Sequence, residues 1–301
     1  MSAKAAAIVN AHAAAGLARY RWPRTARMLA QRLGDVEVRF TRQPGDAIGL
    51  ARELARAGCD PLIAAGGDGT LNEVANGLLE SQCDARLGIL PIASGGDFAR
   101  LLGLRNLTTA LDVLAAQHCR AVDIVRASLQ TRAGPAARYF VNVASIGLGG
   151  LVTADVQTKW RFLPGSMRYL AATIPRLAGN RVFDLRLYLD GVDAGRFHAT
   201  IVSLGNGRYQ GGGILIAPAA NIHDGLIHVT LVEHVSLGEV LRHLPILYNG
   251  RIYTYPKVRL WPAQRVRVEG EAPAELDGEP LGSLPLEAEV IPGALRLICP
   301  A

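Results

Sequence analysis

The sequence lacks several patterns that would assign it to a common protein class. No uninterrupted apolar run approaches ~18 residues, the length that a transmembrane helix needs, and the first ten residues have no signal-peptide cleavage site. The four cysteines are scattered and form no C-x-x-C pair, which is typical of reduced thiols in a cytoplasmic protein. The seven histidines have no H-E-x-x-H or similar spacing, which argues against a zinc site. These absences predict a cytoplasmic protein without a transmembrane segment.

The composition is that of a globular chain with a basic charge balance. The 301 residues, half of them hydrophobic, suffice for one large domain or two ordinary ones. The formal net charge of +6, carried almost wholly by arginine, is compatible with phospholipid headgroups, nucleotide phosphates or an ordinary basic surface. No basic block is interleaved with aromatic residues. We therefore expect no nucleic-acid partner, and the charge alone selects no other ligand.

A glycine-rich turn is the most informative stretch. Apolar residues 62–65 predict a buried strand, and residues 71–79 have helical spacing. Three glycines, an aspartate and a threonine lie between them: Gly66, Gly67, Asp68, Gly69 and Thr70. The glycines let the backbone approach a ligand closely, and the free N–H groups at the start of the helix favour an anion such as phosphate. Thr70 and Glu73 also have the spacing of a capping box, a structural alternative for those two residues.

In the first part of the chain, predicted strands alternate with predicted helices. The strands are expected at residues 5–9, 36–41, 62–65, 87–90 and 121–125. The helices are expected at residues 17–33, with an interruption near Pro23, and at residues 47–57, 71–79 and 107–116. This alternation predicts an α/β domain with a parallel sheet between helices. Ligands bind such sheets beyond the carboxyl ends of the strands, which is where the glycine-rich turn falls.

The pattern changes after residue 128. Short alternating segments separated by Asp-Gly turns predict a mainly antiparallel β-sandwich. We therefore place a domain boundary near residue 127 and expect a second domain over residues 128–292. A largely helical insertion at residues 151–178 carries aromatic and basic side chains. It either lies on a membrane surface or packs inside the domain.

Four motifs in order resemble those of the bacterial diacylglycerol-kinase-like lipid kinases, relatives of the sphingosine, ceramide and NAD kinases and the phosphofructokinases. The first is residues 66–70, which lack the G-x-G-x-x-G and G-K-S/T patterns of commoner nucleotide loops. The second, residues 91–100, ends in Asp-Phe-Ala-Arg; the third, residues 211–226, contains three glycines, Ala-Pro and Asp-Gly. The fourth is residues 275–280 with Asp-Gly-Glu. The resemblance spans nearly the whole chain.

The resemblance implies an enzyme, an ATP- and Mg²⁺-dependent lipid kinase that transfers the γ-phosphoryl group to a hydroxyl of a diacylglycerol-like lipid. It implies an NAD kinase- and phosphofructokinase-like α/β domain over residues 1–127 that binds the nucleotide, and a β-sandwich domain for the lipid. Residues 293–301 are expected to return to the first domain. The implied ATP-binding residues are Asn10, Thr41, Gly66, Gly67, Asp68, Gly69, Thr70, Leu71, Asn72, Glu73, Ser94 and Asp97.

The third motif implies a magnesium site. The carboxylate of Asp224 and the backbone carbonyls of Asn221 and Leu226 are its implied ligands, and hard oxygen ligands of this kind suit Mg²⁺. Asp68 and Asp123 would belong to a water-bridged network near it. Asp123 has a structural alternative, an acid that caps a nearby loop.

The fourth motif implies the general base that takes a proton from the lipid hydroxyl. Asp277 and Glu279 are equal candidates, and both are retained here. Thr41 likewise keeps two interpretations, a contact to ATP or an ordinary β-branched strand residue.

Two other functions remain compatible with the sequence. One is an NAD-kinase-like enzyme with a soluble acceptor. The other is a non-catalytic nucleotide- or lipid-binding protein, because Ala11, Ala93 and Gly96 depart from the family pattern. The sequence leaves open whether these departures change ATP binding or nucleotide preference, which lipid is the acceptor, and the oligomeric state, a homodimer included. We expect the protein to meet its lipid substrate peripherally, at the inner face of the membrane.

Overall fold

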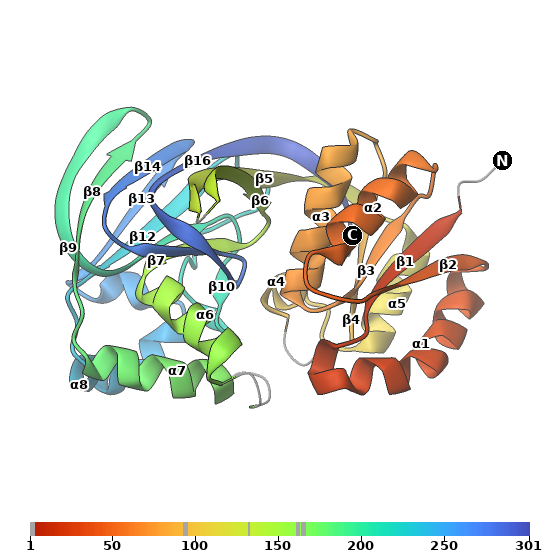
Figure 1. Cartoon of the computed structure of the whole chain (residues 1–301), viewed down its shortest axis with the longest axis horizontal. Coiled ribbons are helices and arrows are strands. Elements are labelled where there is room, and N and C mark those ends of the chain that lie inside the picture. The colour runs from red at the N-terminus through yellow and green to blue at the C-terminus, as the bar shows by residue number, and fades with distance from the viewer. Residues whose placement is uncertain (1–3, 93–95, 132, 161–162, 164–166) are drawn as a thin grey trace. The chain divides into compact units, whose positions relative to one another are not determined.

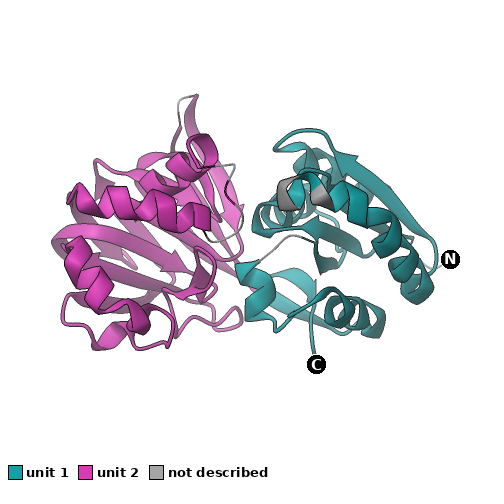
Figure 2. Cartoon of the chain, turned by 90° about the horizontal axis from the view of Figure 1, so that it is seen from below, with its two compact units in different colours: residues 1–122, 293–301 teal, residues 123–292 magenta. Residues whose placement is uncertain are grey.

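The structure, a computed structural model, describes residues 4–92, 96–131, 133–160, 163 and 167–301. The chain forms two compact units (Figure 2): unit 1 comprises residues 1–122 and 293–301, and unit 2 comprises residues 123–292. The chain passes between the units within two long strands, β5 (Cys119–Thr131) and β16 (Glu279–Ile298). The boundary that the sequence placed near residue 127 thus falls inside β5.

Unit 1 is built on a parallel sheet. Strand β1 (Ala5–Asn10) pairs with β2 (Val36–Thr41) on one side and with β3 (Leu62–Gly66) on the other, and β3 pairs with β4 (Leu87–Pro91). The end of β16 adds to β4 in parallel, with Leu297 opposite Leu87. The predicted α/β architecture is confirmed.

Helices cover both faces of this sheet. Helices α2 (Asp46–Arg56) and α3 (Asp68–Ser81) lie side by side on one face (Figure 1). Helices α1 (Leu17–Leu33) and α5 (Leu107–Ala116) pack on the other face, where alternate strand residues such as Val9 and Ile63 form a core with Leu29 and Leu111. A short helix, α4 (Asp97–Leu101), follows β4.

Two sequence predictions in unit 1 are wrong. Helix α1 is continuous through Pro23. The burial of Trp22 and Leu29 on either side of it offsets the lost hydrogen bond and the ring clash that a proline brings to a helix interior. Helix α3 begins at Asp68 and not at Leu71, so Asp68 and the two residues after it form its first turn.

Unit 2 consists of antiparallel strands around one core. Its strands are β5, β6 (Gly134–Phe140), β7 (Val143–Gly147), β8 (Phe183–Leu189), β9 (Val192–Gly205), β12 (Ile227–Glu233), β13 (Val258–Ala263), β14 (Arg265–Gly270), β15 (Pro273–Leu276) and β16. One run of strands has the order β13-β12-β9-β7-β15, and β8 links β9 to β14. Alternate residues such as Ile146, Leu204 and Leu231 point into the core. The predicted antiparallel β-rich domain is confirmed.

Helices and a small hairpin complete unit 2. Helices α6 (Leu148–Thr158) and α7 (Met167–Ala178) pack together through Val152, Val156 and Ala172. Helix α8 (Leu237–Arg242), which the sequence did not predict, is followed by 3-10 turns, and β10 (Tyr209–Gln210) pairs with β11 (Ile214–Leu215). None of the helices within the described ranges is long and apolar enough to cross a membrane.

Candidate functional site

The glycine-rich turn connects β3 directly to α3. Gly66 cannot be replaced without movement, because a Cβ there would lie 2.3 Å from Oγ1 of Thr70. Gly67 is the N-cap of α3 and, as a glycine, brings no side chain to cap the helix. A Cβ on Gly69 would meet no described atom within 4 Å. The first turn of α3 therefore has N–H groups and a clear approach for an anion.

Thr70 and Glu73 do not form the capping box that their spacing suggested. Oγ1 of Thr70 accepts a hydrogen bond from Nδ2 of Asn10 at 3.1 Å, which joins the end of β1 to α3. The carboxylate of Glu73 accepts from the backbone amides of Gly45 at 3.0 Å and Ala47 at 3.1 Å. Glu73 thus caps the start of α2, so the capping-box prediction is wrong.

The carboxylate of Asp68 points to α4. It accepts hydrogen bonds from the amides of Asp97 at 2.8 Å and Phe98 at 3.1 Å. Burial raises the pKa of Asp68, and these two amides and Arg100 oppose that rise. A Cβ on Gly96 would lie 3.3 Å from Oδ1 of Asp68. Glycine, where the family pattern has asparagine, therefore leaves room for this carboxylate.

The other predicted ATP-binding residues of unit 1 have different surroundings. Thr41 is buried at the end of β2 and lies in register beside Asn10. The side chains of Leu71 and Asn72 are buried, and Oδ1 of Asn72 accepts from Nδ2 of Asn76 at 3.1 Å. For Leu71 and Asn72, only the backbone could reach a ligand. Asp97 is buried at the start of α4, whereas Ser94 and its neighbour Ala93 lie outside the described residues.

In unit 2, Asp224 organises the turn before β12. Its Oδ1 accepts from the amide of Leu226 at 3.0 Å, and its Oδ2 lies 2.9 Å from Nε2 of His228. The carbonyl of Asn221 accepts from the amide of Asp224 at 3.3 Å. Oδ2 of Asp123 accepts from the amide of Gly225 at 2.7 Å. Asp123 therefore caps this turn, as the structural alternative for it supposed.

The chemistry of the Asp224 turn fits Mg²⁺. The turn supplies one carboxylate and the carbonyls of Asn221 and Leu226, and Mg²⁺ prefers oxygen ligands with only one or two carboxylates. Across the described ranges, no group of three or more His, Cys, Asp or Glu side chains could hold a metal ion. A metal here would therefore depend on backbone oxygen atoms.

His228 is a member of this turn that the sequence analysis missed. Its side chain is buried, and its Nδ1 has no hydrogen-bond partner among the described residues. The available signal was its position four residues after Asp224, but it was hidden in the alternating pattern of a strand.

The Asp277 turn is held by backbone amides. Oδ2 of Asp277 accepts from Val141 at 2.7 Å, and Oδ1 accepts from Asn142 at 3.0 Å and Val143 at 2.9 Å. The residue is buried and has a φ of 48°. Asp277 thus ties its turn to the start of β7. Glu279, the first residue of β16, is half-buried.

Glu275, just before this turn, is a second carboxylate that the sequence analysis passed over. Its Oε2 accepts from the amide of Gly278 at 2.6 Å, and its Oε1 accepts from Nε2 of Gln210 at 2.7 Å. Complete burial raises the pKa of Glu275 to about 8, helped by the negative charge of Asp277 and opposed by the Gly278 amide. The side chain is therefore mainly un-ionised at neutral pH.

Two family models together match most of the chain. Residues 4–127 match the diacylglycerol kinase catalytic domain, and residues 142–299 match the YegS C-terminal NAD kinase beta sandwich-like domain. A Klebsiella pneumoniae protein named "Probable lipid kinase YegS-like" is 32% identical over 275 residues, covering 88% of this chain and 86% of its own length. A Chromohalobacter salexigens protein of the same name is 35% identical over 272 residues, covering 87% and 83%.

Solved structures agree with these matches. A diacylglycerol kinase from Bacillus anthracis superposes with a TM-score of 0.77 at 25% identity, covering 99% of this chain and 97% of that one. An Archaeoglobus fulgidus NAD kinase in complex with ATP gives a TM-score of 0.51 at 15% identity, covering 97% and 92%. The second likeness concerns the fold alone.

Proposed function

The chain belongs to the diacylglycerol-kinase-like lipid kinases, and we propose that it transfers the γ-phosphoryl group of ATP to a hydroxyl of a diacylglycerol-like lipid. The observation that carries this proposal is the first turn of α3, whose N-cap is the glycine Gly67 and which Gly69 leaves accessible. Such a turn suits the phosphates of a nucleotide. Unit 1 would hold ATP, and unit 2 would hold the acceptor and its base. Transfer of labelled phosphate from ATP to a lipid tests this directly.

The residues of unit 1 would act by positioning the phosphates. Phosphoryl transfer depends mainly on positioning and on the neutralisation of charge. The amides of residues 67–70 would donate to the phosphates, with Asn10 and Thr41 beside them at the ends of β1 and β2. Asp68 would act indirectly, because its carboxylate fixes the start of α4 next to this turn.

Of the two candidate bases, we favour Glu279. The oxygens of Asp277 already accept three backbone amides, so that carboxylate is committed to holding its turn. Glu279 follows directly and is half-buried at the start of β16. Its carboxylate would take the proton from the lipid hydroxyl as the oxygen attacks phosphorus.

A magnesium ion would be held by Asp224 and by the carbonyls of Asn221 and Leu226. When bound, it would neutralise negative charge on the phosphates. Asp123 and His228 would position the Asp224 turn, one through the Gly225 amide and the other through the carboxylate itself.

Alanine at Gly69 should weaken ATP binding without destabilising the protein. Gly69 lies in the first turn of α3, where a Cβ meets no described atom and alanine is the better helix former by up to about 1 kcal/mol. The added methyl would occupy the path of the phosphates, so we expect ATP affinity to fall by at least about tenfold, or ~1.4 kcal/mol, in isothermal titration.

Gly238→Ala in α8 is the matched control. A Cβ there would have its nearest described neighbour 4.0 Å away, so ATP affinity should not change. If Gly69→Ala binds ATP as tightly as the wild type does, the phosphates do not lie on this turn.

We further propose that a surface of unit 2 docks on the membrane. It consists of two exposed apolar groups, which we call the α7–α8 patch: Met167, Leu170 and Ile174 on α7, and Leu241, Leu244 and Tyr248 on and after α8. The α7 residues follow the spacing of one helix face. Leu170 is 58% exposed and Leu241 is 57% exposed, and a cluster of such residues marks an interaction surface more often than scattered ones do.

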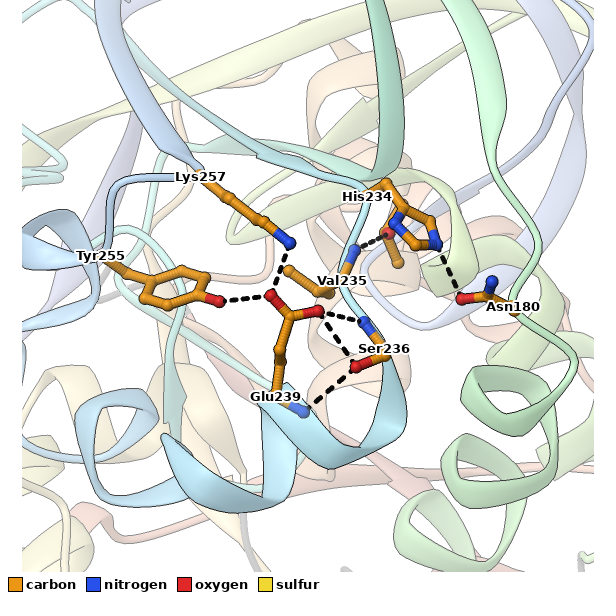
Figure 3. A network of polar contacts seen from close by, with 8 residues as sticks. Asn180, His234, Val235, Ser236, Glu239, Tyr255 and Lys257 are labelled. Atoms are coloured by element: carbon orange, nitrogen blue, oxygen red, sulfur yellow. Dashed lines mark hydrogen bonds and ion pairs between the residues drawn. The ribbon is translucent and has the colours of Figure 1, made fainter.

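Polar contacts fix the two halves of the α7–α8 patch to unit 2 (Figure 3). His234 before α8 lies 2.7 Å, through Nε2, from Oδ1 of Asn180 after α7. Ser236 and Glu239 form a capping box at the start of α8, and Glu239 also accepts from the hydroxyl of Tyr255 and from Lys257. These donors, above all Lys257, hold the pKa of Glu239 well below its usual range.

The charges around the α7–α8 patch suit an anionic lipid surface. Residues 167–183 and 240–268 contain no aspartate or glutamate, and the carboxylate of Glu239 in α8 is paired with Lys257. They contain arginines, including Arg168, Arg242 and Arg251. Apolar side chains among cationic ones favour the interface of a bilayer that carries anionic lipids.

Glutamate at Leu170 should weaken binding to vesicles of phosphatidylglycerol by at least about tenfold in sedimentation assays, because it puts a charge into the apolar contact and opposes the anionic surface. Val192→Glu is the control, since Val192 is 69% exposed at the start of β9, outside the α7–α8 patch. Equal vesicle binding by the two variants would contradict docking through this patch.

A further inference from the structure

A row of polar side chains crosses four neighbouring strands of unit 2. Glu275 of β15 lies in register with Ser145 of β7, Ser145 with Ser203 of β9, and Ser203 with Thr230 of β12. All four residues have 0% exposure, and their neighbours along each strand form the core on the opposite face. Burying polar groups costs free energy unless they are hydrogen-bonded. The hydrogen bonds that these buried side chains make therefore indicate which part of the structure the row stabilises.

Three members of the row, Glu275, Ser145 and Ser203, are bonded through Gln210 on the β10–β11 hairpin. Nε2 of Gln210 donates to Oε1 of Glu275 at 2.7 Å, and its Oε1 accepts from Oγ of Ser145 at 2.9 Å. Oγ of Ser145 lies 3.2 Å from Oγ of Ser203. Helix α6 covers the row closely, since a Cβ on Gly149 would lie 2.4 Å from Cβ of Ser145. The buried part of the network thus lies under α6, and it ends at Glu275.

Glu275 also holds the turn that follows it. Its Oε2 accepts from the amide of Gly278 at 2.6 Å. Asp277 and Gly278 both have positive φ, 48° and 84°, between the paired residues Leu276 and Glu279, which is the geometry that Asp-Gly favours in a two-residue hairpin turn. The Asp277 carboxylate fixes one side of the turn to residues 141–143, and Glu275 fixes the other. Glu279 is the next residue along the chain.

Resting on the proposed function, we propose that Glu275 is a positioning residue for the base. Glu275 accepts from the Gly278 amide and so fixes the turn that precedes Glu279. Gln210 donates to Glu275 and so fixes the Glu275 side chain. Glu275 is fully buried and contacts no substrate, so its effect is on the geometry of proton transfer. Small displacements of reacting groups reduce rates strongly.

The surroundings favour a neutral Glu275. Asp277 is the charged group that acts on it among the described residues, and Gln210 and Ser145 are neutral. Burial and the charge of Asp277 keep the carboxyl protonated below about pH 8. A protonated Glu275 would donate its proton to the amide oxygen of Gln210, with the Gln210 amide turned over from the orientation given above. Glutamine at position 275 can make the same bonds in that orientation, because its Oε1 accepts the Gly278 amide and its Nε2 donates to Gln210. Ionisation above this pH would place a second negative charge beside Asp277.

Three variants test this inference. Glu275→Ala should lower kcat at least about tenfold and leave KM for ATP within about twofold, because ATP is held by residues of unit 1. Glu275→Gln should keep kcat within about threefold at pH 7, and it should lose less activity than the wild type above about pH 8. Thr230→Val, in the same row but without a bond to the turn, should leave kcat unchanged.

Hydrogen exchange separates this inference from the proposed function. The Gly278 amide should exchange at least about tenfold faster in Glu275→Ala than in the wild type, measured by NMR under conditions where both are folded. Unchanged exchange, an unchanged kcat in folded Glu275→Ala, or an equal loss of kcat in both Glu275 variants at pH 7 would overturn the inference. Absence of lipid phosphorylation by the wild type would count against the proposed function alone, and the exchange rate would still decide the positioning role.

Discussion

Replacing Glu279 by glutamine should lower phosphoryl transfer to lipid by at least about a hundredfold, the usual contribution of a general base. Glutamine keeps the size of the side chain but cannot accept the proton of the lipid hydroxyl. The thermal stability and the ATP affinity should stay close to those of the wild type, because glutamine keeps the size and the polar character of this half-buried side chain at the start of β16. Initial rates at saturating ATP and lipid measure the effect.

The matched control is Glu271→Gln, the same chemical change at an exposed position shortly before β15. It should leave the rate within about twofold. A Glu279→Gln variant that keeps most of its activity, together with an inactive but folded Asp277→Asn variant, would assign the base to Asp277 and contradict our preference.

Replacing Asp277 by alanine should destabilise the protein by about 3 kcal/mol. Three backbone amides would lose their acceptor, and each unsatisfied buried donor costs ~1 kcal/mol or more. Alanine is also less suited than aspartate to the φ of 48° at this position. Urea denaturation should show a lower midpoint, and activity should be lost together with the folded state.

Asp190→Ala is a comparison within the same unit. Asp190 also has a positive φ of 51°, and its Oδ1 accepts the amides of Gln264 and Arg265, but it lies in an exposed turn. Water can replace the lost acceptor there, so Asp190→Ala should lower the free energy of unfolding by clearly less than Asp277→Ala does. An equal loss of unfolding free energy in the two variants would show that the burial of the amides around Asp277 does not add to its stabilising effect.

The sequence allowed the layers of the fold to be predicted because they follow from local patterns. Alternating strands and helices led to the parallel sheet of unit 1, and Asp-Gly turns between short strands led to the antiparallel unit 2. The glycine-rich turn between β3 and α3 was equally visible, since glycine is required where Gly66 meets Thr70. In this stretch the start of α3 was misplaced, because a helix can begin inside a glycine-rich stretch when the tertiary structure supports it.

The partners of the acidic side chains could not be predicted in the same way. Glu73 bonds amides 26 and 28 residues away, and Asp277 bonds amides 134 to 136 residues away. Such pairings depend on how distant strands are placed, which spacing along the chain does not encode. Local spacing therefore suggested a capping box at Glu73, and the family resemblance left two equal candidates for the base, whereas the hydrogen bonds give Glu73 and Asp277 structural roles.

The most direct test of the central proposal is phosphate transfer from γ-labelled ATP with Mg²⁺ into a total lipid extract in mixed micelles. We predict a labelled product in the organic phase with the wild type and a reduction of at least about a hundredfold with Glu279→Gln. ATP binding without any labelled lipid, or label found only in a water-soluble acceptor, would contradict the assignment of lipid kinase activity to this protein.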